Sequence, residues 1–288
     1  MRVLILLFSL TYLSHSFVLS QDLNDEKKFE YSSYLYFRLN KKMYIDNFNL
    51  SCFDSRRHIF NFMQNDLSLN IKLTKKAILL IGDALYINNW SPQYLKAYNN
   101  DIALGAIYFH RPTIGMKYKF SFTKKLELEE TFTYQYFTPS MEKYHSRLVL
   151  GSKISYDNKR WPLEFEPFAQ MILYYYLNGS PQLYYDQAGN YDGYYSPNGF
   201  HRYRFRIGFK FKPFKNNLPK FDFMLYYAGQ NEFNVPLLGG HPINFTRENV
   251  PINVKQTTIL PYNSYHILGA QINYVFDNNA NSNSKRRK

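Results

Sequence analysis

The sequence predicts an all-β protein: a transmembrane antiparallel β-barrel of about twelve strands that follows a cleaved signal peptide. The first observation is the segment 200–214, FHRYRFRIGFKFKPF, in which aromatic and cationic residues alternate. A period of two residues is that of a β-strand with two unlike faces. The second observation is that this alternation recurs along most of the chain. One soluble core could not bury so many apolar faces, whereas a membrane barrel turns them toward lipid and turns the charges inward.

The N-terminus, MRVLILLFSLTYLSHSFVLSQD, has the parts of a secretory signal peptide. Arg2 precedes an apolar run at 3–13, and the residues at 18–20 are small enough for cleavage before Gln21. An uncleaved anchor helix is the alternative, but the run is shorter than the ~20 residues of a membrane span. We therefore expect residues 1–20 to be removed and the protein to be exported to a bacterial outer membrane.

Eleven segments have strand patterning, and the connections between them alternate in length. The expected strands are 30–39, 43–53, 66–73, 77–90, 105–122, 125–137, 144–156, 163–177, 200–213, 220–229 and 264–276. Short connections rich in Lys and Asn lie near 40–42, 74–76, 123–124, 158–160 and 215–217, and long ones near 54–65, 91–104, 138–143, 178–199 and 230–263. Short periplasmic turns and longer outer loops are typical of outer-membrane barrels. The loop 178–199 is expected to be exposed and irregular.

An odd strand count conflicts with the even number that is normal for bacterial single-chain barrels. With eleven strands, the first and the last run in the same direction. The best candidate for a twelfth strand is 251–260, PINVKQTTIL, which has a proline at its start, where a strand tolerates one. Adding it does not by itself set the direction of both ends. The expected organisation is a barrel over 21–276 and a polar, basic tail over 277–288.

Composition limits the partners that this chain can have. The formal net charge is +13, which raises the possibility of nucleic-acid binding. The signal peptide and the alternation of cations with aromatics on strands argue against nucleic acid and favour outer-membrane lipid as the partner. The single cysteine, Cys52, excludes an internal disulfide framework. It shares a strand face with Phe48 and Leu50, so we interpret it as a small apolar residue. The oligomeric state stays open.

Charged residues on the inward face can pair between neighbouring strands, and such pairs stabilise a sheet by ~0.2–1 kcal/mol each. One hairpin is expected to fold about Thr123, and a second pairing joins 163–177 to 200–213. The expected pairs are Lys117 with Glu129, Lys119 with Glu127, Glu164 with Lys212 and Glu166 with Lys210, while Gln170 faces Arg206 and Asp222 can reach Lys210. Glu130 is the one charge on the apolar parity of its strand, and a bulge there would explain it.

Arg202, Arg204 and Arg206 lie toward the outer end of their strand, where the sequence offers fewer acidic partners. They are therefore the best candidates for contact with a ligand or a phosphate group. Two interpretations of the inward charges stay open. One is a charge lattice that fills and stiffens a narrow lumen. The other is a cation-lined conduit for small anionic solutes.

Catalytic and metal-binding motifs are weak. His145 and Ser146 are adjacent, so on a strand they face opposite sides and cannot form a dyad. The sequence contains no nucleophile-elbow glycines, no HExxH motif and no paired cysteines. We therefore expect no catalytic residue, no metal and no cofactor.

Three stretches carry a resemblance to a known family. They are the early hairpin LYFRLNKKMYIDNFNL, the hairpin pair from Tyr144 to Tyr176 with KRWPLEFEPF after its turn, and RYRFRIGFKFKP followed by FDFMLYYAGQNEFN. Together they resemble an uncharacterised family of outer-membrane β-barrels of Bacteroidota, a domain-of-unknown-function family. The resemblance spans Phe29 to Phe276, although the early strand lacks an expected tryptophan. That family has no established activity, so the resemblance implies fold and location only.

The leading function hypothesis is a non-enzymatic outer-membrane protein with a narrow, charge-lined lumen and a structural, binding or minor transport role. The first alternative is a diffusion pore for small anionic solutes, which unpaired Arg202, Arg204 and Arg206 would favour. The second is a membrane-embedded lipid hydrolase, which would need a Ser/His pair meeting across neighbouring strands. A soluble secreted β-protein is disfavoured by the repeated aromatic faces.

Overall fold

The structure, a computed structural model, describes residues 27–54, 60–89, 106–138, 144–179, 182–185, 191–195, 198–214, 220–232 and 265–277. Its strands are β1 (Lys27–Arg38), β2 (Met43–Asp54), β3 (Phe60–Lys72), β4 (Ala77–Asn89), β5 (Ala106–His110), β6 (Thr113–Ser121), β7 (Leu126–Tyr136), β8 (Tyr144–Tyr156), β9 (Glu166–Gly179), β10 (Gln182–Tyr185), β11 (Tyr191–Tyr195), β12 (Gly199–Phe211), β13 (Phe221–Glu232) and β14 (Tyr265–Asp277). A short 3-10 turn, η1 (Pro162–Glu164), precedes β9.

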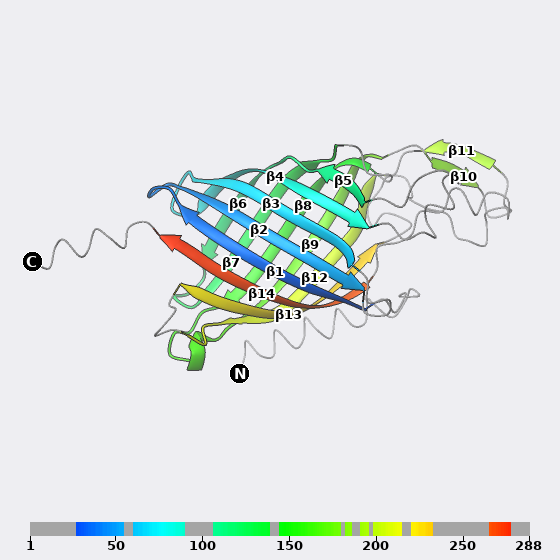
Figure 1. The fold of residues 1–288 in the computed structure, drawn as a ribbon. Coiled ribbons are helices and arrows are strands. Elements are labelled where there is room, and N and C mark those ends of the chain that lie inside the picture. The colour runs from blue at the N-terminus through cyan, green and yellow to red at the C-terminus, as the bar shows by residue number, and fades with distance from the viewer. Residues whose placement is uncertain are drawn as a thin grey trace, which may run out of the picture.

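Eleven of these strands close into a barrel, in the order β3-β2-β1-β14-β13-β12-β9-β8-β7-β6-β4, and β4 pairs back with β3 (Figure 1). Neighbours are antiparallel except at one place, where β1 and β14 pair in parallel from Lys27 opposite His266 to Arg38 opposite Asp277. The all-β barrel that the alternation predicts is confirmed. The odd count is resolved by this parallel seam, which joins the two strands that run in the same direction.

All eleven predicted segments are strands, with one interruption. The predicted strand 105–122 is broken at Arg111–Pro112 into β5 and β6, which follow each other along the same edge of β4. Proline has no N–H to give to the ladder. Around the break, the backbone N–H groups of Ala84 and Arg111 each bond to the other residue's carbonyl oxygen. β5 thus lies outside the closed ring and pairs with β4, and His110 at its end also bridges to Thr138 just after β7.

Two expectations about local structure are wrong. The loop at 178–199 is not wholly irregular, because it contains the separate two-stranded sheet β10-β11. Glu130 lies on β7 without a bulge, since the register with β6 and β8 runs through it unbroken. It stays on the outward face, where the Ser152 hydroxyl donates to its carboxylate at 2.7 Å. The expected signal peptide, the possible strand at 251–260 and the tail after Asp277 lie outside the described residues.

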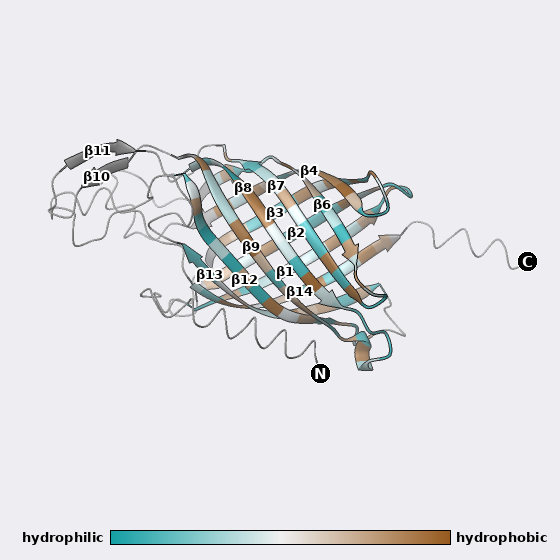
Figure 2. Cartoon of the chain, turned by 180° about the vertical axis from the view of Figure 1, so that it is seen from behind, coloured by the Kyte–Doolittle hydropathy of each residue, from teal (hydrophilic) through white to brown (hydrophobic). Residues whose placement is uncertain are grey.

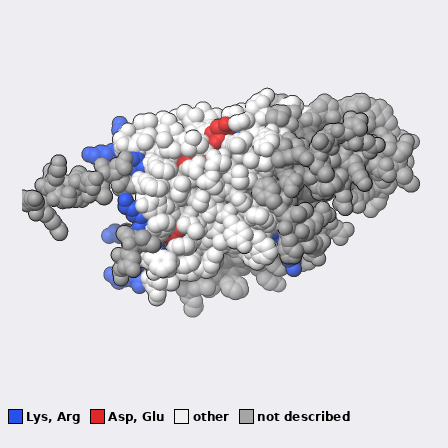
Figure 3. Space-filling model, viewed as in Figure 1, with Lys and Arg blue, Asp and Glu red and all other residues white. Residues whose placement is uncertain are grey.

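The short connections gather at one end of the barrel and repeat one turn geometry. In each of three turns, an Asn or Thr side chain accepts hydrogen bonds from the two backbone N–H groups that follow two and three residues later. The residues are Asn40, Thr74 and Thr123. This local bonding is the reason such residues favour turns. Each of the three is followed by two lysines, and Figure 3 shows Lys and Arg gathered at this end.

Side chains alternate between the two faces of the barrel wall, as Figure 2 shows by hydropathy. The core lies inside the barrel and includes Phe168, Tyr226, Ala228, Tyr265 and Ile267. Large apolar side chains lie exposed on the outer wall, among them Ile114, Phe132, Leu150, Leu225 and Leu268. An apolar outer band around an interior that carries most of the polar and charged residues is compatible with a membrane barrel.

Candidate luminal site

Two ion pairs are buried inside the barrel toward the end that carries the long connections. Arg204 on β12 contacts both carboxylate oxygens of Glu30 on β1, at 2.9 and 2.7 Å. Arg202 contacts Glu232 on β13 at 2.8 Å. The side chains of Glu30 and Glu232 are fully buried. Both Arg204–Glu30 bonds come from one guanidinium nitrogen, Nη2. Hydrogen bonds between two charged groups are stronger than neutral ones, and they can offset part of the cost of burying two charges.

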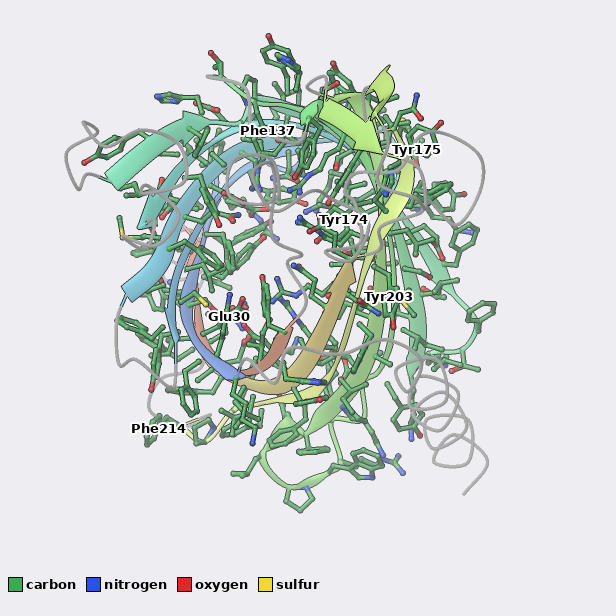
Figure 4. The ribbon with its side chains drawn as sticks, turned by 90° about the vertical axis from the view of Figure 1, so that its right-hand side faces the viewer. Glu30, Phe137, Tyr174, Tyr175, Tyr203 and Phe214 are labelled. Carbon is green, nitrogen blue, oxygen red and sulfur yellow. The ribbon has the colours of Figure 1, made fainter. Side chains whose placement is uncertain are left out.

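The Arg204–Glu30 pair crosses the interior instead of following the sheet. Strands β13 and β14 lie between its two strands, and Tyr226 on β13 donates a hydrogen bond from its hydroxyl to Glu30 at 2.7 Å. The Tyr226 ring reaches Glu30 over Gly269, where a Cβ would lie 2.0 Å from the ring. Glycine is required there by this close approach. Figure 4 looks along the barrel and shows Glu30 and Tyr174 pointing inward.

Aromatic side chains continue the filling around Arg202. Tyr176 donates a hydrogen bond to Glu232 and stacks on Tyr144 at 4.1 Å between ring centroids. His201 also stacks on Tyr176, with 5.4 Å between the two ring centroids. Tyr86 on β4, which lies opposite β12 in the strand order, is close enough to Arg202 to interact with it electrostatically.

His201 is a correction to the sequence pattern. Alternation places it on the outward face with Phe205, yet its side chain is fully buried against Tyr176. A register shift between β9 and β12 occurs between Phe200 and Arg202. A bulge of this kind adds one residue and breaks the two-residue period locally, so His201 turns inward.

The end with the short turns carries the predicted acidic and basic residues, with one register error. Lys210 pairs with Glu166 at 2.6 Å, and Lys212 with Glu164 at 3.1 Å, as predicted. Gln170 lies opposite Arg206, also as predicted. Asp222 accepts a hydrogen bond from Asn273, and it is close enough to Lys210 to interact with it electrostatically.

The β6–β7 hairpin does not fold about Thr123. Lys119 lies opposite Glu129, and its amine contacts Glu127 at 2.8 Å and Glu129 at 3.0 Å. Thr123 opens the turn and caps it, so two further residues are needed before β7 begins and the register moves by two. Lys117, predicted to face Glu129, lies opposite Thr131 and reaches Asp46 on β2 at 3.9 Å.

The predicted scarcity of acidic partners for Arg202 and Arg204 is wrong. Arg206 differs from them, since its guanidinium lies 4.3 Å from the Tyr226 ring centroid, a cation–π contact. The alternation of β1 identifies Glu30 as inward, and it could have flagged this acid. Its partner could not be found, because two whole strands intervene. A further pair that sequence reasoning missed is Arg111 with Asp66, at 3.1 and 3.2 Å.

A hollow of about 810 Å³ opens beside the parallel seam. Its lining is almost entirely apolar and includes Phe29, Tyr31, Leu225, Tyr227 and Leu268, which lie on the outward parity of their strands. Such a surface suits hydrocarbon and offers few hydrogen bonds to a polar ligand.

Within the described ranges, no group of three or more His, Cys, Asp or Glu residues is placed to hold a metal ion. None of the described helical residues forms a segment long and apolar enough to span a bilayer. No protein-family model matches the chain, and no curated protein is significantly similar to it.

Proposed function

We propose that this chain is a non-enzymatic outer-membrane β-barrel whose interior is closed by a charge and aromatic plug, and that it serves a structural or binding role. The carrying observation is the Arg204–Glu30 pair, which spans the interior from β12 to β1 with both charges buried. A wide water-filled channel would leave such side chains hydrated. We call the plug the group Glu30, Arg202, Arg204, Tyr226 and Glu232.

The apolar outer wall and the short connections at one end support placement in an outer membrane. The expected signal peptide supports export. The buried side chains of the plug support a barrel that conducts few ions or solutes. Breaking one member of a buried ion pair costs about 3–5 kcal/mol, because the remaining charge stays uncompensated. The plug is therefore hard to open by local motion.

A pore for small anionic solutes is the second candidate, and interior cations that lie against aromatic rings favour it. Arg147 and Arg206 lie against aromatic rings, and Lys153 lies 5.0 Å from the Phe168 ring centroid. Cations held this way keep their charge available to the lumen and would attract anions.

Single-channel recording of the refolded mature protein in planar bilayers separates the two. We expect little or no conductance from the wild type. The quadruple variant Glu30→Ala/Arg202→Ala/Arg204→Ala/Glu232→Ala removes both pairs together and leaves no unpaired charge of either, so it should open a steady conductance.

The matched control is Glu166→Ala/Lys210→Ala, which removes a pair that joins neighbouring strands. We expect this control to conduct as the wild type does. A large, stable, anion-selective conductance from the wild type would instead support the pore, and the variant Arg202→Ala/Arg204→Ala/Arg206→Ala should then reduce its selectivity.

A further inference from the structure

The outward face of β1 to β3 carries polar side chains at the middle of the wall. Ser33 on β1 lies opposite Asn49 on β2, and Asn49 lies opposite Asn65 on β3. Asn47 is the next outward residue of β2. Ser33, Asn47, Asn49 and Asn65 form what we call the amide patch. Figure 3 faces this wall and shows almost no Lys or Arg between its two ends.

Apolar side chains flank the patch along every strand, which places it at mid-depth and not at a membrane surface. On β1, the outward neighbours of Ser33 are Tyr31 toward one end and Leu35 toward the other. On β2, Ile45 and Phe53 lie beyond the polar stretch on either side. In contrast, the residue of β14 opposite Ser33 is Ile272, and outward residues of β12 such as Phe205 and Ile207 are also apolar.

The amide patch is hydrogen-bonded within itself but keeps donors to spare. Asn49 donates to Asn47 at 2.7 Å and to Ser33 at 3.4 Å, and it accepts from Asn65. Asn47 donates to Asn65 at 3.5 Å. A side-chain amide has two N–H donors. In the part of the chain that the structure describes, Asn47 and Asn65 each use one.

Polar side chains that face hydrocarbon lose their bonds to water, and those bonds must be replaced by protein. Between transmembrane helices, polar side chains commonly hydrogen-bond across the interface, at about 0.6 kcal/mol each, and the same need applies to polar groups on a barrel wall. We propose that the amide patch is the contact surface between two copies of this chain, which meet within the bilayer through β1 to β3. The inference rests on the proposed membrane location.

A second copy fits the patch better than a different protein for a chemical reason. A two-fold interface brings each surface against itself, so it must be self-complementary. Amides satisfy this requirement, because each one both donates and accepts, and the patch has no net charge to repel its twin.

The test measures dimers of the full mature chain in phosphatidylcholine vesicles at high lipid-to-protein ratio, by amine-reactive cross-linking. The heat-dependent shift of gel mobility reports folding and insertion separately. We expect a dimer band from the wild type. The variant Asn47→Leu/Asn49→Leu/Asn65→Leu should insert normally, since leucine suits lipid, and should lose about tenfold or more of the dimer.

The control variant Ile114→Leu/Met116→Leu/Phe132→Leu changes three outward residues of β6 and β7, away from the patch, and should dimerise as the wild type does. A folded wild type that stays monomeric overturns the inference, as does a leucine variant that dimerises undiminished. A wild type that fails to insert overturns the proposed membrane location, and the inference falls with it.

Discussion

At the scale of single residues, the interior depends on small side chains that let large ones cross. Tyr226 reaches Glu30 only because Gly269 leaves room beneath its ring, and Glu30 in turn holds Arg204. Because Gly269 has a hydrogen atom where other residues have Cβ, the contact between Arg204 on β12 and Glu30 on β1 can form. Packed interiors have little slack for added volume.

Gly269→Ala should destabilise the barrel by about 1–3 kcal/mol, because the added methyl group displaces Tyr226 from Glu30. The control Gly151→Ala has 3.6 Å to its nearest neighbour, Thr131, and should change stability by less than about 0.5 kcal/mol. Urea unfolding of the two variants in vesicles measures the difference. Equal midpoints for both would contradict the role given to Gly269.

At the scale of elements, the short turns set the register of the strands that they join. The error in the predicted register of Lys117 and Lys119 arose at this turn, although the predicted contact of Lys119 with Glu127 is confirmed at 2.8 Å. Alternation identified the inward residues of β6 and β7 correctly, but it carries no information on how many residues a turn consumes. Thr123 bonds to the N–H groups of both Lys125 and Leu126, and this capping fixes the count.

Thr123→Ala should lower stability by about 0.5–1.5 kcal/mol, because the backbone N–H groups of Lys125 and Leu126 lose the hydroxyl that accepts from them and must bond to water instead. Lys124→Ala changes an exposed side chain in the same turn and provides the control. Unfolding midpoints in vesicles are the measurement, and a loss at Lys124 as large as that at Thr123 would refute the capping role.

At the scale of the whole molecule, alternation alone predicted the all-β barrel and located the segments that close it, because the two-residue period is local. The expected antiparallel barrel of about twelve strands is in fact closed by eleven, with one parallel pair. The parallel seam and the Arg204–Glu30 pair were beyond it, since both depend on strands far apart in sequence. Of the deviations from the period, the break at Arg111–Pro112 has a sequence signal in its proline, whereas the register shift that turns His201 inward has none. Bulges leave no fixed signature in a sequence.

Phe205→Arg should cost about 2–4 kcal/mol in a bilayer, because Phe205 lies midway along the outward face of β12. Phe211 lies at the short-turn end of the same strand. Phe211→Arg should therefore cost only about 0–1 kcal/mol beyond the loss of the ring contacts of Phe211. Folding into vesicles, followed by gel mobility across a urea series, gives both values. Equal losses would contradict a lipid-facing wall.

The parallel seam has a consequence for anything attached to the chain. A barrel with an even number of strands returns its end to the side from which it began, as a hairpin does. Here β1 starts at the end with the long connections and β14 finishes at the end with the short turns. Once the barrel is in a membrane, a partner tethered before Lys27 and one tethered after Asp277 would lie on opposite sides of that membrane.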